Sequence, residues 1–396
     1  MTTAEIKAMA TDYIMNTYGD RDLAFVRGEG PYLWDADGTK YLDFLGGLAV
    51  NGLGHCHPNV VAAIREQAAT LLHVSNLYYI EPQAKLAKLL IDNCELDKCF
   101  FCNSGAEANE AAIKLARKHS KDQGRSDAYE IITMENSFHG RTMATITATA
   151  QRKYHEGFEP MVPGFTYVPF DDLRETEAAI TERTCAILVE AIQSEGGVNT
   201  PSDGYIQGLR DLCDANGLLL ILDEVQTAMG RLGTFFGYQC YGVVPDVLTM
   251  AKSLGGGVPI GAMLAKEHVA DSFVPGTHAA TFGGNPLITA AAYATVQTVI
   301  NEDLASNSAK MGDYLTRQLL ELKEKYPIHE IRGRGLLRGL VMSVDAKLLA
   351  AKCIENGLIT ICTNDYVLRF LPPVNITRSH VDEAVSILKA SMAEVL

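Results

Sequence analysis

Short apolar runs alternate with stretches of helical periodicity through the middle of the chain. The runs lie at residues 98–102, 130–134, 185–189, 218–222, 247–251 and 260–265. Elsewhere apolar residues recur every three or four positions, as Val60, Ile64, Ala68 and Leu71 do. They follow Pro58, a residue that favours the first turn of a helix. This alternation predicts an α/β fold in which helices cover both faces of a mostly parallel sheet.

The two ends of the chain follow different patterns. Residues 1–57 predict a short helix and a hairpin whose turn lies at residues 35–38. The carboxyl-terminal part predicts a long amphipathic helix, a group of strands and a final helix. These strands are expected at residues 328–331, 336–344 and 367–370. We therefore predict a large domain over residues 58–302 and a small α+β domain built from residues 1–57 and 303–396.

Composition narrows the class of protein. The chain has 396 residues, and its 34 Lys and Arg against 48 Asp and Glu give a net charge of −14. This charge repels polyanions, so neither nucleic acid nor an anionic membrane is an expected partner. The nine cysteines are scattered through apolar segments, which is typical of reduced thiols in a cytoplasmic protein. No targeting segment is apparent, and the longest apolar run, residues 218–222, is too short to cross a bilayer.

Two short motifs look similar to metal-binding sequences. Cys99 and Cys102 form a C-x-x-C motif, but no second pair follows at zinc spacing and the segment is predicted to be a strand. His55, Cys56 and His57 are adjacent on an extended turn, where neighbouring ligands rarely close a tetrahedral site. We therefore predict no metal site.

Polar residues that end the apolar runs are the strongest candidates for chemistry, because open α/β sheets bind ligands at the carboxyl ends of their strands. The first run leads into the small residues of 103–109 and then a helix, a pattern that suits a phosphate as well as an ordinary helix start. The run at residues 218–222 ends in Asp223 and Glu224. Burial of such an aspartate is unfavourable unless a cation meets it.

Two nucleotide-binding classes are disfavoured. A P-loop NTPase requires G-x-x-x-x-G-K-[ST], and the chain has no such segment. A nicotinamide-dependent dehydrogenase requires G-x-G-x-x-G, and the candidate segment that begins at Gly333 and Gly335 lacks the third glycine.

Lys252 follows the apolar run at residues 247–251. Partial desolvation at a strand end lowers the pKa of an amine and makes it a nucleophile suited to a Schiff base, although a surface lysine would also fit this position. In a further segment, Phe138 provides a ring that can stack on a flat ligand, and Arg141 provides a guanidinium that can bind a carboxylate. A phosphate loop, a buried carboxylate, a stacking ring and a nucleophilic lysine together match what pyridoxal phosphate requires of its protein.

Several segments resemble those of the class III (ornithine-type) pyridoxal-phosphate-dependent aminotransferases, a fold-type I family. They span nearly the whole chain: AFVRGEGPYLWDADGTKYLDFLGGLAVNGLGHCHP (24–58), NSGAEANEAAIKLARK (103–118), FHGRT (138–142), LDEVQTAMGR (222–231), PDVLTMAKSLGGGVPIGAML (245–264), TFGGNP (281–286) and VLRFLPP (367–373). The resemblance implies a seven-stranded type of sheet in the large domain.

The resemblance also implies a set of cofactor contacts. They come from Ser104, Gly105, Ala106, Phe138, Asp223, Gln226, Lys252 and Thr281. By the family pattern, residues 104–106 hold the phosphate, Phe138 stacks on the ring and Asp223 pairs with the ring nitrogen. Gln226 touches the ring hydroxyl, and Lys252 forms the Schiff base and moves the proton. Thr281 holds the phosphate of the neighbouring subunit's cofactor, so a homodimer with shared active sites is expected.

The implied reaction transfers the terminal amino group of N²-acetyl-L-ornithine to 2-oxoglutarate. Its products are N-acetyl-L-glutamate 5-semialdehyde and L-glutamate, as in arginine biosynthesis. By resemblance, Arg141 binds the carboxylate distant from the reacting amine, and Arg369 binds the α-carboxylate of glutamate. Glu195 is expected to mask Arg369 when the donor presents a terminal amine, and Ala280 occupies a position that touches the substrate.

The chain departs from the family pattern near the substrate. The departures are Ala191, Ser194, Ala228, Leu232 and Ala280. They leave succinylornithine, ornithine, N-acetyllysine and 4-aminobutyrate open as alternative donors. A class III racemase or lyase would share the cofactor residues but would form no stoichiometric glutamate. An inactive binding protein of the same fold would lack Lys252 or Asp223, and both are present.

Overall fold

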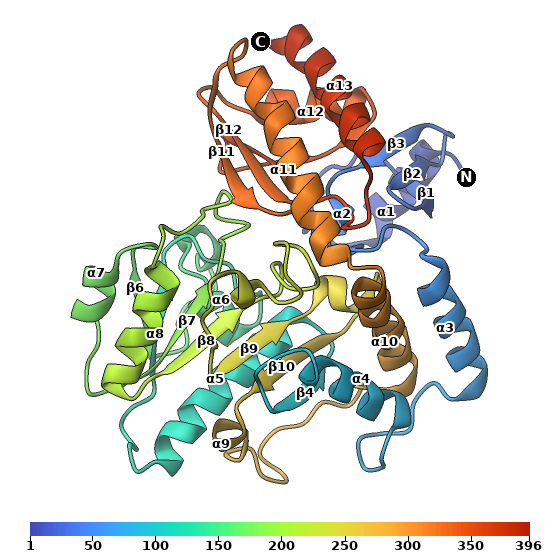
Figure 1. Ribbon diagram of the computed structural model, residues 1–396. Coiled ribbons are helices and arrows are strands. Elements are labelled where there is room, and N and C mark those ends of the chain that lie inside the picture. Colours follow the sequence, from blue (N-terminus) through green and yellow to red (C-terminus); the bar gives the residue numbers. More distant parts are fainter.

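The central sheet of the computed structural model, which describes residues 1–396, has seven strands (Figure 1). In spatial order they are β4 (Lys98–Cys102), β10 (Gly261–Ala265), β9 (Val247–Met250), β8 (Leu219–Asp223), β7 (Thr184–Glu190), β5 (Glu130–Met134) and β6 (Phe165–Val168). Strand β10 is antiparallel to both of its neighbours, and all other pairs are parallel. The predicted mostly parallel sheet is confirmed.

The predicted strands agree closely with the observed ones. Residues 98–102 and 130–134 are strands over their full predicted lengths, as β4 and β5. Strand β6 is the exception, because this short edge strand is partly exposed and has no continuous apolar run. An edge strand that is buried on one face lacks the signal that marks the fully buried strands.

Side chains of the central strands alternate between two apolar cores. In β8, Leu220 and Leu222 belong to one core, and Leu219 and Ile221 belong to the other. Helices α3 (Pro58–Thr70), α4 (Glu81–Ile91), α8 (Tyr205–Asn216) and α10 (Pro286–Asn301) contribute to the first core. Helices α5 (Gly105–Asp122), α6 (Met143–Ala148) and α9 (Glu267–Ala270) contribute to the second, and α7 (Leu173–Ala178) lies near the β6 edge (Figure 1). Both faces of the sheet are therefore covered, as the apolar runs predict.

A second sheet joins the two ends of the chain. Its order is β1 (Phe25–Glu29), β2 (Tyr32–Asp35), β3 (Lys40–Asp43) and β13 (Leu358–Ile359). Strands β2 and β3 form the predicted antiparallel hairpin, and the parallel pair Leu42 and Leu358 connects it to the carboxyl-terminal part. The short helix α2 (Gly46–Ala49) leads from β3 toward the central sheet.

The carboxyl-terminal part adds a third sheet and three helices. The sheet order is β11 (Ile328–Arg334), β12 (Leu337–Met342), β15 (Val367–Phe370) and β14 (Ile361–Thr363). The helices are α11 (Leu304–Lys323), α12 (Lys347–Glu355) and α13 (Arg378–Val395). Leu42 and Phe44 from the amino-terminal part are buried in the core of these elements, at the top of Figure 1. The short strands β13 and β14 have no counterpart among the strands expected from the sequence.

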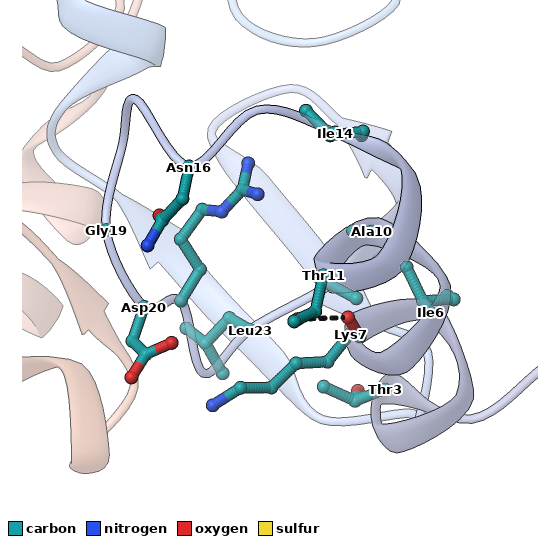
Figure 2. A pocket seen from close by; sticks show the side chains of 12 residues that line it. Thr3, Ile6, Lys7, Ala10, Thr11, Ile14, Asn16, Gly19, Asp20 and Leu23 are labelled. Carbon is teal, nitrogen blue, oxygen red and sulfur yellow. Dashed lines mark hydrogen bonds between the residues drawn. The ribbon is translucent and has the colours of Figure 1, made fainter.

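The amino-terminal helix α1 (Thr3–Tyr13) packs against the segment that follows it. The cavity between them, about 180 Å³ in volume, is shown in Figure 2, where the Thr11 hydroxyl donates to Lys7 O at 2.9 Å. None of the site residues predicted from the sequence lines this cavity. Throughout the structure, no helix is both long enough and apolar enough to cross a membrane.

Candidate active site

A cavity of about 480 Å³ opens at the carboxyl ends of the central strands. Its walls come from the last residues of β7 and β8 and from the segments that follow β4, β5, β8 and β9. Most of the site residues predicted from the sequence line it: Ser104, Gly105, Ala106, Phe138, Arg141, Asp223, Gln226 and Lys252. The parallel order of β5, β7, β8 and β9 brings their carboxyl ends to one edge of the sheet.

The amino terminus of α5 forms one wall of the cavity. Ser104 is the N-cap, and its hydroxyl accepts a hydrogen bond from Glu107 N at 3.1 Å. The amides of Gly105 and Ala106 lie in the first turn, where they have no helical acceptor and where the helix dipole favours an anion. A Cβ atom on Gly105 would lie 2.8 Å from Val225 Cγ2, so this close approach requires glycine. The wall fits a phosphate group.

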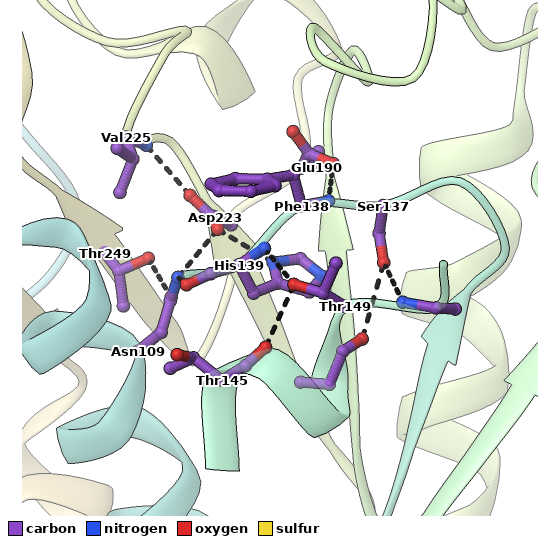
Figure 3. Close-up of polar contacts among 12 residues, drawn as sticks. Asn109, Ser137, Phe138, His139, Thr145, Thr149, Glu190, Asp223, Val225 and Thr249 are labelled. Atoms are coloured by element: carbon purple, nitrogen blue, oxygen red, sulfur yellow. Dashed lines mark hydrogen bonds and ion pairs between the residues drawn. The ribbon is translucent and has the colours of Figure 1, made fainter. Parts of the chain in front are cut away.

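A network of hydrogen bonds holds the Asp223 carboxylate (Figure 3). His139 Nδ1 and Asn109 Nδ2 each lie 2.8 Å from Asp223 Oδ2. Val225 N donates to Asp223 Oδ1 at 3.0 Å, and Thr249 Oγ1 donates to Asn109 Oδ1 at 2.7 Å. These contacts come from four different segments. They hold the Asp223 carboxylate, which is almost completely buried, in one orientation.

A second buried carboxyl group, Glu190, ends the neighbouring strand β7. Phe138 N donates to Glu190 Oε2 at 3.0 Å. Burial, together with the negative charge of Asp223, raises the pKa of Glu190 well above its ordinary value. Proton binding to Glu190 is therefore favoured relative to an exposed glutamate.

Lys252 follows β9 and begins a short 3₁₀ turn, η3 (Lys252–Gly255). Its φ of 44° is uncommon for a residue with a side chain and persists only where the surrounding structure enforces it. Burial lowers the pKa of the Lys252 amine to about 8, although the charges of Glu195, Asp223 and Glu190 act to raise it. An amine with this pKa is a good nucleophile near neutral pH.

Glu195 and Arg369 form an ion pair, as expected for a carboxylate that masks the arginine. Arg369 Nη1 lies 3.1 Å from Glu195 Oε1. Burial acts to raise the pKa of Glu195, but the charges of Arg369 and Lys252 outweigh burial and hold that pKa below its ordinary value. Glu195 is therefore ionised in the pair.

Arg141 has no carboxylate partner in the structure. Its side chain is exposed at the cavity, where Cζ lies 4.0 Å from the centre of the Tyr154 ring and 5.5 Å from that of Phe138. Glu195 and Arg369 are not among the residues that line the cavity, although the charges of both affect the pKa of Lys252. Ala280 and Thr281 do not join the cavity either. They line a separate groove, and Thr281 is exposed. Within one chain, the other eight predicted site residues line the cavity together.

The cavity has unsatisfied polar groups that fit a polar, aromatic cofactor. Gln226 is only 7% exposed, and its Oε1 is buried in the wall without a hydrogen-bond partner. Because orphaned buried polar atoms are unfavourable, this oxygen is available to accept a hydrogen bond from a ligand. With the anion-binding wall and the buried Asp223, the residues fit the phosphate, ring hydroxyl and ring nitrogen of pyridoxal phosphate.

Polar residues of the site that have no role assigned from the sequence include Asn109, His139 and Glu190. Glu190 carries the same signal that selected Asp223, because an acidic residue closes a buried apolar run in both cases. Asn109 is a lone amide on the alanine-rich buried face of α5. His139 has no comparable signal, since its contact with Asp223 depends on the position of the whole segment after β5.

Comparison with known proteins shows similarity to one enzyme family. The family model described as aminotransferase class-III matches residues 14–392. The acetylornithine aminotransferase of Caldanaerobacter subterraneus subsp. tengcongensis is 48% identical over 97% of this chain and 98% of its own length. That of Methanocaldococcus jannaschii is 49% identical over 97% and 96%, respectively. A solved structure of ornithine aminotransferase from Toxoplasma gondii, with PLP at partial occupancy at its active site, is 34% identical, has a TM-score of 0.95, and covers 99% of this chain and 95% of its own.

Proposed function

The chain belongs to the class-III aminotransferases, and we propose that it transfers the terminal amino group of N²-acetyl-L-ornithine to 2-oxoglutarate with pyridoxal phosphate as cofactor. The observation that carries the proposal is the place of Lys252, a lysine of lowered pKa in the same cavity as the buried Asp223. The choice of donor is supported by relatives that bear this activity in their names and align over nearly the whole chain.

The residues that hold the cofactor come from the cavity walls. The amides of Gly105 and Ala106 bind the phosphate, Asp223 binds the ring nitrogen and Gln226 binds the ring hydroxyl. Pyridoxal phosphate, when bound, supplies an electron sink for the carbanion that forms at the substrate carbon. Asp223 would keep the ring nitrogen protonated, because its carboxylate is buried and held by Asn109, His139 and Val225.

Lys252 has two tasks in the proposed reaction. It would hold the cofactor through its amine, and Lys252 Nζ would take the proton from the substrate carbon that bears the amino group. A pKa of about 8 suits both tasks, because the amine can accept a proton and return it near neutral pH.

Arg141 and Arg369 distinguish the two substrates by the positions of their carboxylates. N²-acetyl-L-ornithine has one carboxylate, distant from the reacting amine, and the exposed Arg141 binds it. No second carboxylate then reaches Arg369, which stays paired with Glu195. 2-Oxoglutarate brings a second carboxylate next to its reacting carbon. Glu195 must then release Arg369, and the same cavity accepts both partners in turn.

The test is a titration of the purified holoenzyme followed by its visible absorption spectrum. Loss of the cofactor band with N²-acetyl-L-ornithine, and its return with 2-oxoglutarate, is the expected result. Ornithine, succinylornithine, N-acetyllysine and 4-aminobutyrate serve as separate donors, and glutamate formed is counted against donor consumed. A response to only one of these other amines would refute the donor and leave the reaction class intact. Turnover without stoichiometric glutamate would indicate a racemase or lyase.

We also propose that the active enzyme is a homodimer. The segment before α4 exposes Leu77, Tyr78 and Tyr79, which are 84%, 66% and 107% exposed in a single chain. Such an apolar surface is typical of a subunit interface. Thr281 lies in the groove beside Leu77 and outside the cavity of its own chain, so a second copy seated there would receive Thr281 at its phosphate.

Mixed dimers test this assignment. A chain with Lys252→Ala and a chain with Thr281→Val are each expected to be impaired alone. If Thr281 serves the partner, the mixed dimer has one intact site, because Lys252 comes from one chain and Thr281 from the other. If Thr281 serves its own chain, no intact site forms and mixing restores no activity. Sedimentation of the wild-type enzyme measures the oligomeric state directly.

A further inference from the structure

Ser194 contacts the arginine that Glu195 masks. Ser194 is fully buried in the loop after β7, and its hydroxyl accepts a hydrogen bond from Arg369 Nη1 at 3.0 Å. The same nitrogen pairs with Glu195. Arg369 Nε and Nη2 are also buried and have no hydrogen-bond partner. The side-chain contacts of this guanidinium with the protein are therefore made through Nη1, to two consecutive residues.

The backbone of the Ser194 loop is fixed independently of the Glu195 side chain. At its base, Gln193 and Asn199 exchange two backbone hydrogen bonds, of 3.1 Å and 3.0 Å. From the carboxyl-terminal sheet, Thr363 Oγ1 donates to Glu195 O at 2.6 Å, and Arg332 Nη1 donates to Asn199 Oδ1 at 3.0 Å. The Glu195 carboxylate can thus turn away while the Ser194 hydroxyl stays in place.

We propose that Ser194 is a positioning residue for Arg369 in the half-reaction with 2-oxoglutarate or glutamate. The inference rests on the proposed function, in which Glu195 must release Arg369 to a substrate carboxylate. Once Glu195 has turned away, the Ser194 hydroxyl is the remaining protein acceptor on Nη1. It reduces the cost of an otherwise unpaired, buried guanidinium and keeps that group where the α-carboxylate binds.

The same geometry predicts little effect on the amine donor. With N²-acetyl-L-ornithine bound, Arg369 keeps its ion pair with Glu195, so the hydroxyl of Ser194 is a secondary contact. Removal of the hydroxyl also leaves Glu195 as the sole partner of Nη1, which favours the masked state. Both effects weaken the binding of the dicarboxylic partner and leave the binding of the amine unchanged.

Two variants separate the hydroxyl from the shape of the side chain. Ser194→Ala removes the acceptor, and Ser194→Cys keeps nearly the same shape but offers only a weak acceptor. In single half-reactions of the holoenzyme, both variants are expected to raise the KM for glutamate and for 2-oxoglutarate roughly tenfold. The KM for N²-acetyl-L-ornithine should change less than about twofold on the same reasoning.

A binding measurement and a matched control complete the test. Calorimetric titration with glutarate, an unreactive dicarboxylate, should show a loss of affinity of about tenfold in both variants. Ser391→Ala is the control, because Ser391 is equally buried and its hydroxyl accepts from Asn356 Nδ2 at 3.0 Å in a region remote from the cavity. This control should lower the melting temperature without any change in glutarate affinity.

The outcomes distinguish this inference from the proposed function. Equal changes in the KM of both partners, an unchanged affinity for glutarate, or wild-type behaviour of Ser194→Cys would each overturn the role of Ser194. A wild-type enzyme that does not react with N²-acetyl-L-ornithine would refute the proposed donor instead. The glutamate and glutarate measurements do not depend on that donor.

Discussion

Arg369 Nη1 lies 3.1 Å from Glu195 Oε1, although Arg369 belongs to β15 of the carboxyl-terminal sheet and Glu195 to the loop after β7 of the central sheet. The pair joins these two parts of the molecule beside the reactive lysine, whose pKa responds to both charges. A substrate carboxylate that replaces Glu195 on Arg369 therefore changes a contact between these two parts.

Replacement of Glu195 by Gln should favour the dicarboxylic partner. The neutral amide competes less well than a carboxylate for Arg369. The KM for glutamate and 2-oxoglutarate should therefore fall by a factor of about three to about ten. This change is opposite in sign to that expected for Ser194→Ala. Steady-state kinetics with both partners measure it. Glu267→Gln, which alters an exposed ion pair with Lys98 at the amino-terminal end of β4, is the control and should leave both KM values unchanged.

Replacement of Asp223 by Asn should slow the reaction and leave substrate binding nearly intact. The neutral amide no longer stabilises a proton on the ring nitrogen, so kcat should fall by roughly a hundredfold to a thousandfold. Asp246→Asn is the matched control, because Asp246 is paired with Arg210 at 2.7 Å at the opposite end of the parallel strands. The Asp246→Asn variant should lower the stability of the protein and leave kcat unchanged. A kcat loss of the same size in both variants would contradict the role of Asp223.

Replacement of Arg141 by Ala should raise the KM for both partners, because each presents a carboxylate distant from the reacting group. We expect this KM to increase about tenfold or more, because the variant loses one charge-assisted contact with the substrate. Lys153→Ala is the control for the loss of a cation at this surface, since Lys153 Nζ lies 4.9 Å from the centre of the same Tyr154 ring that Arg141 covers. An unchanged KM in Arg141→Ala, or an equal effect of Lys153→Ala, would reject the assignment.

Replacement of Lys252 by Met should stabilise the cofactor-free protein near pH 7. Burial lowers the pKa of Lys252 to about 8, so the unfolded chain binds the proton more tightly than the folded one. This destabilising contribution is complete below pH 8 and disappears as the pH rises through 8 toward the ordinary lysine value. The advantage of the variant should therefore shrink between about pH 7 and about pH 9.5. Urea unfolding of both proteins measures it, with the exposed Lys153→Met as control. An advantage that grows with pH would contradict the sign.

Much of the site follows from local sequence patterns. Asp223 and Lys252 each end a buried apolar strand, and the small residues at 103–106 stand between a strand and a helix. Because parallel strands expose their carboxyl ends at one edge, these local patterns are sufficient to place the residues in one cavity. The resemblance to the aminotransferases then assigns their chemistry, which the patterns alone leave open.

The sequence by itself determined the order of the elements and the chemistry at the ends of the buried strands, since both depend on the periodicity of neighbouring residues. Only the tertiary structure decided which distant side chains meet. The contacts of His139 and Asn109 with Asp223, and of Ser194 and Glu195 with Arg369, join segments far apart in the chain. Such contacts depend on strand order, on loop conformation and on the packing of the carboxyl-terminal sheet against the central one, and none of these is encoded in a local pattern.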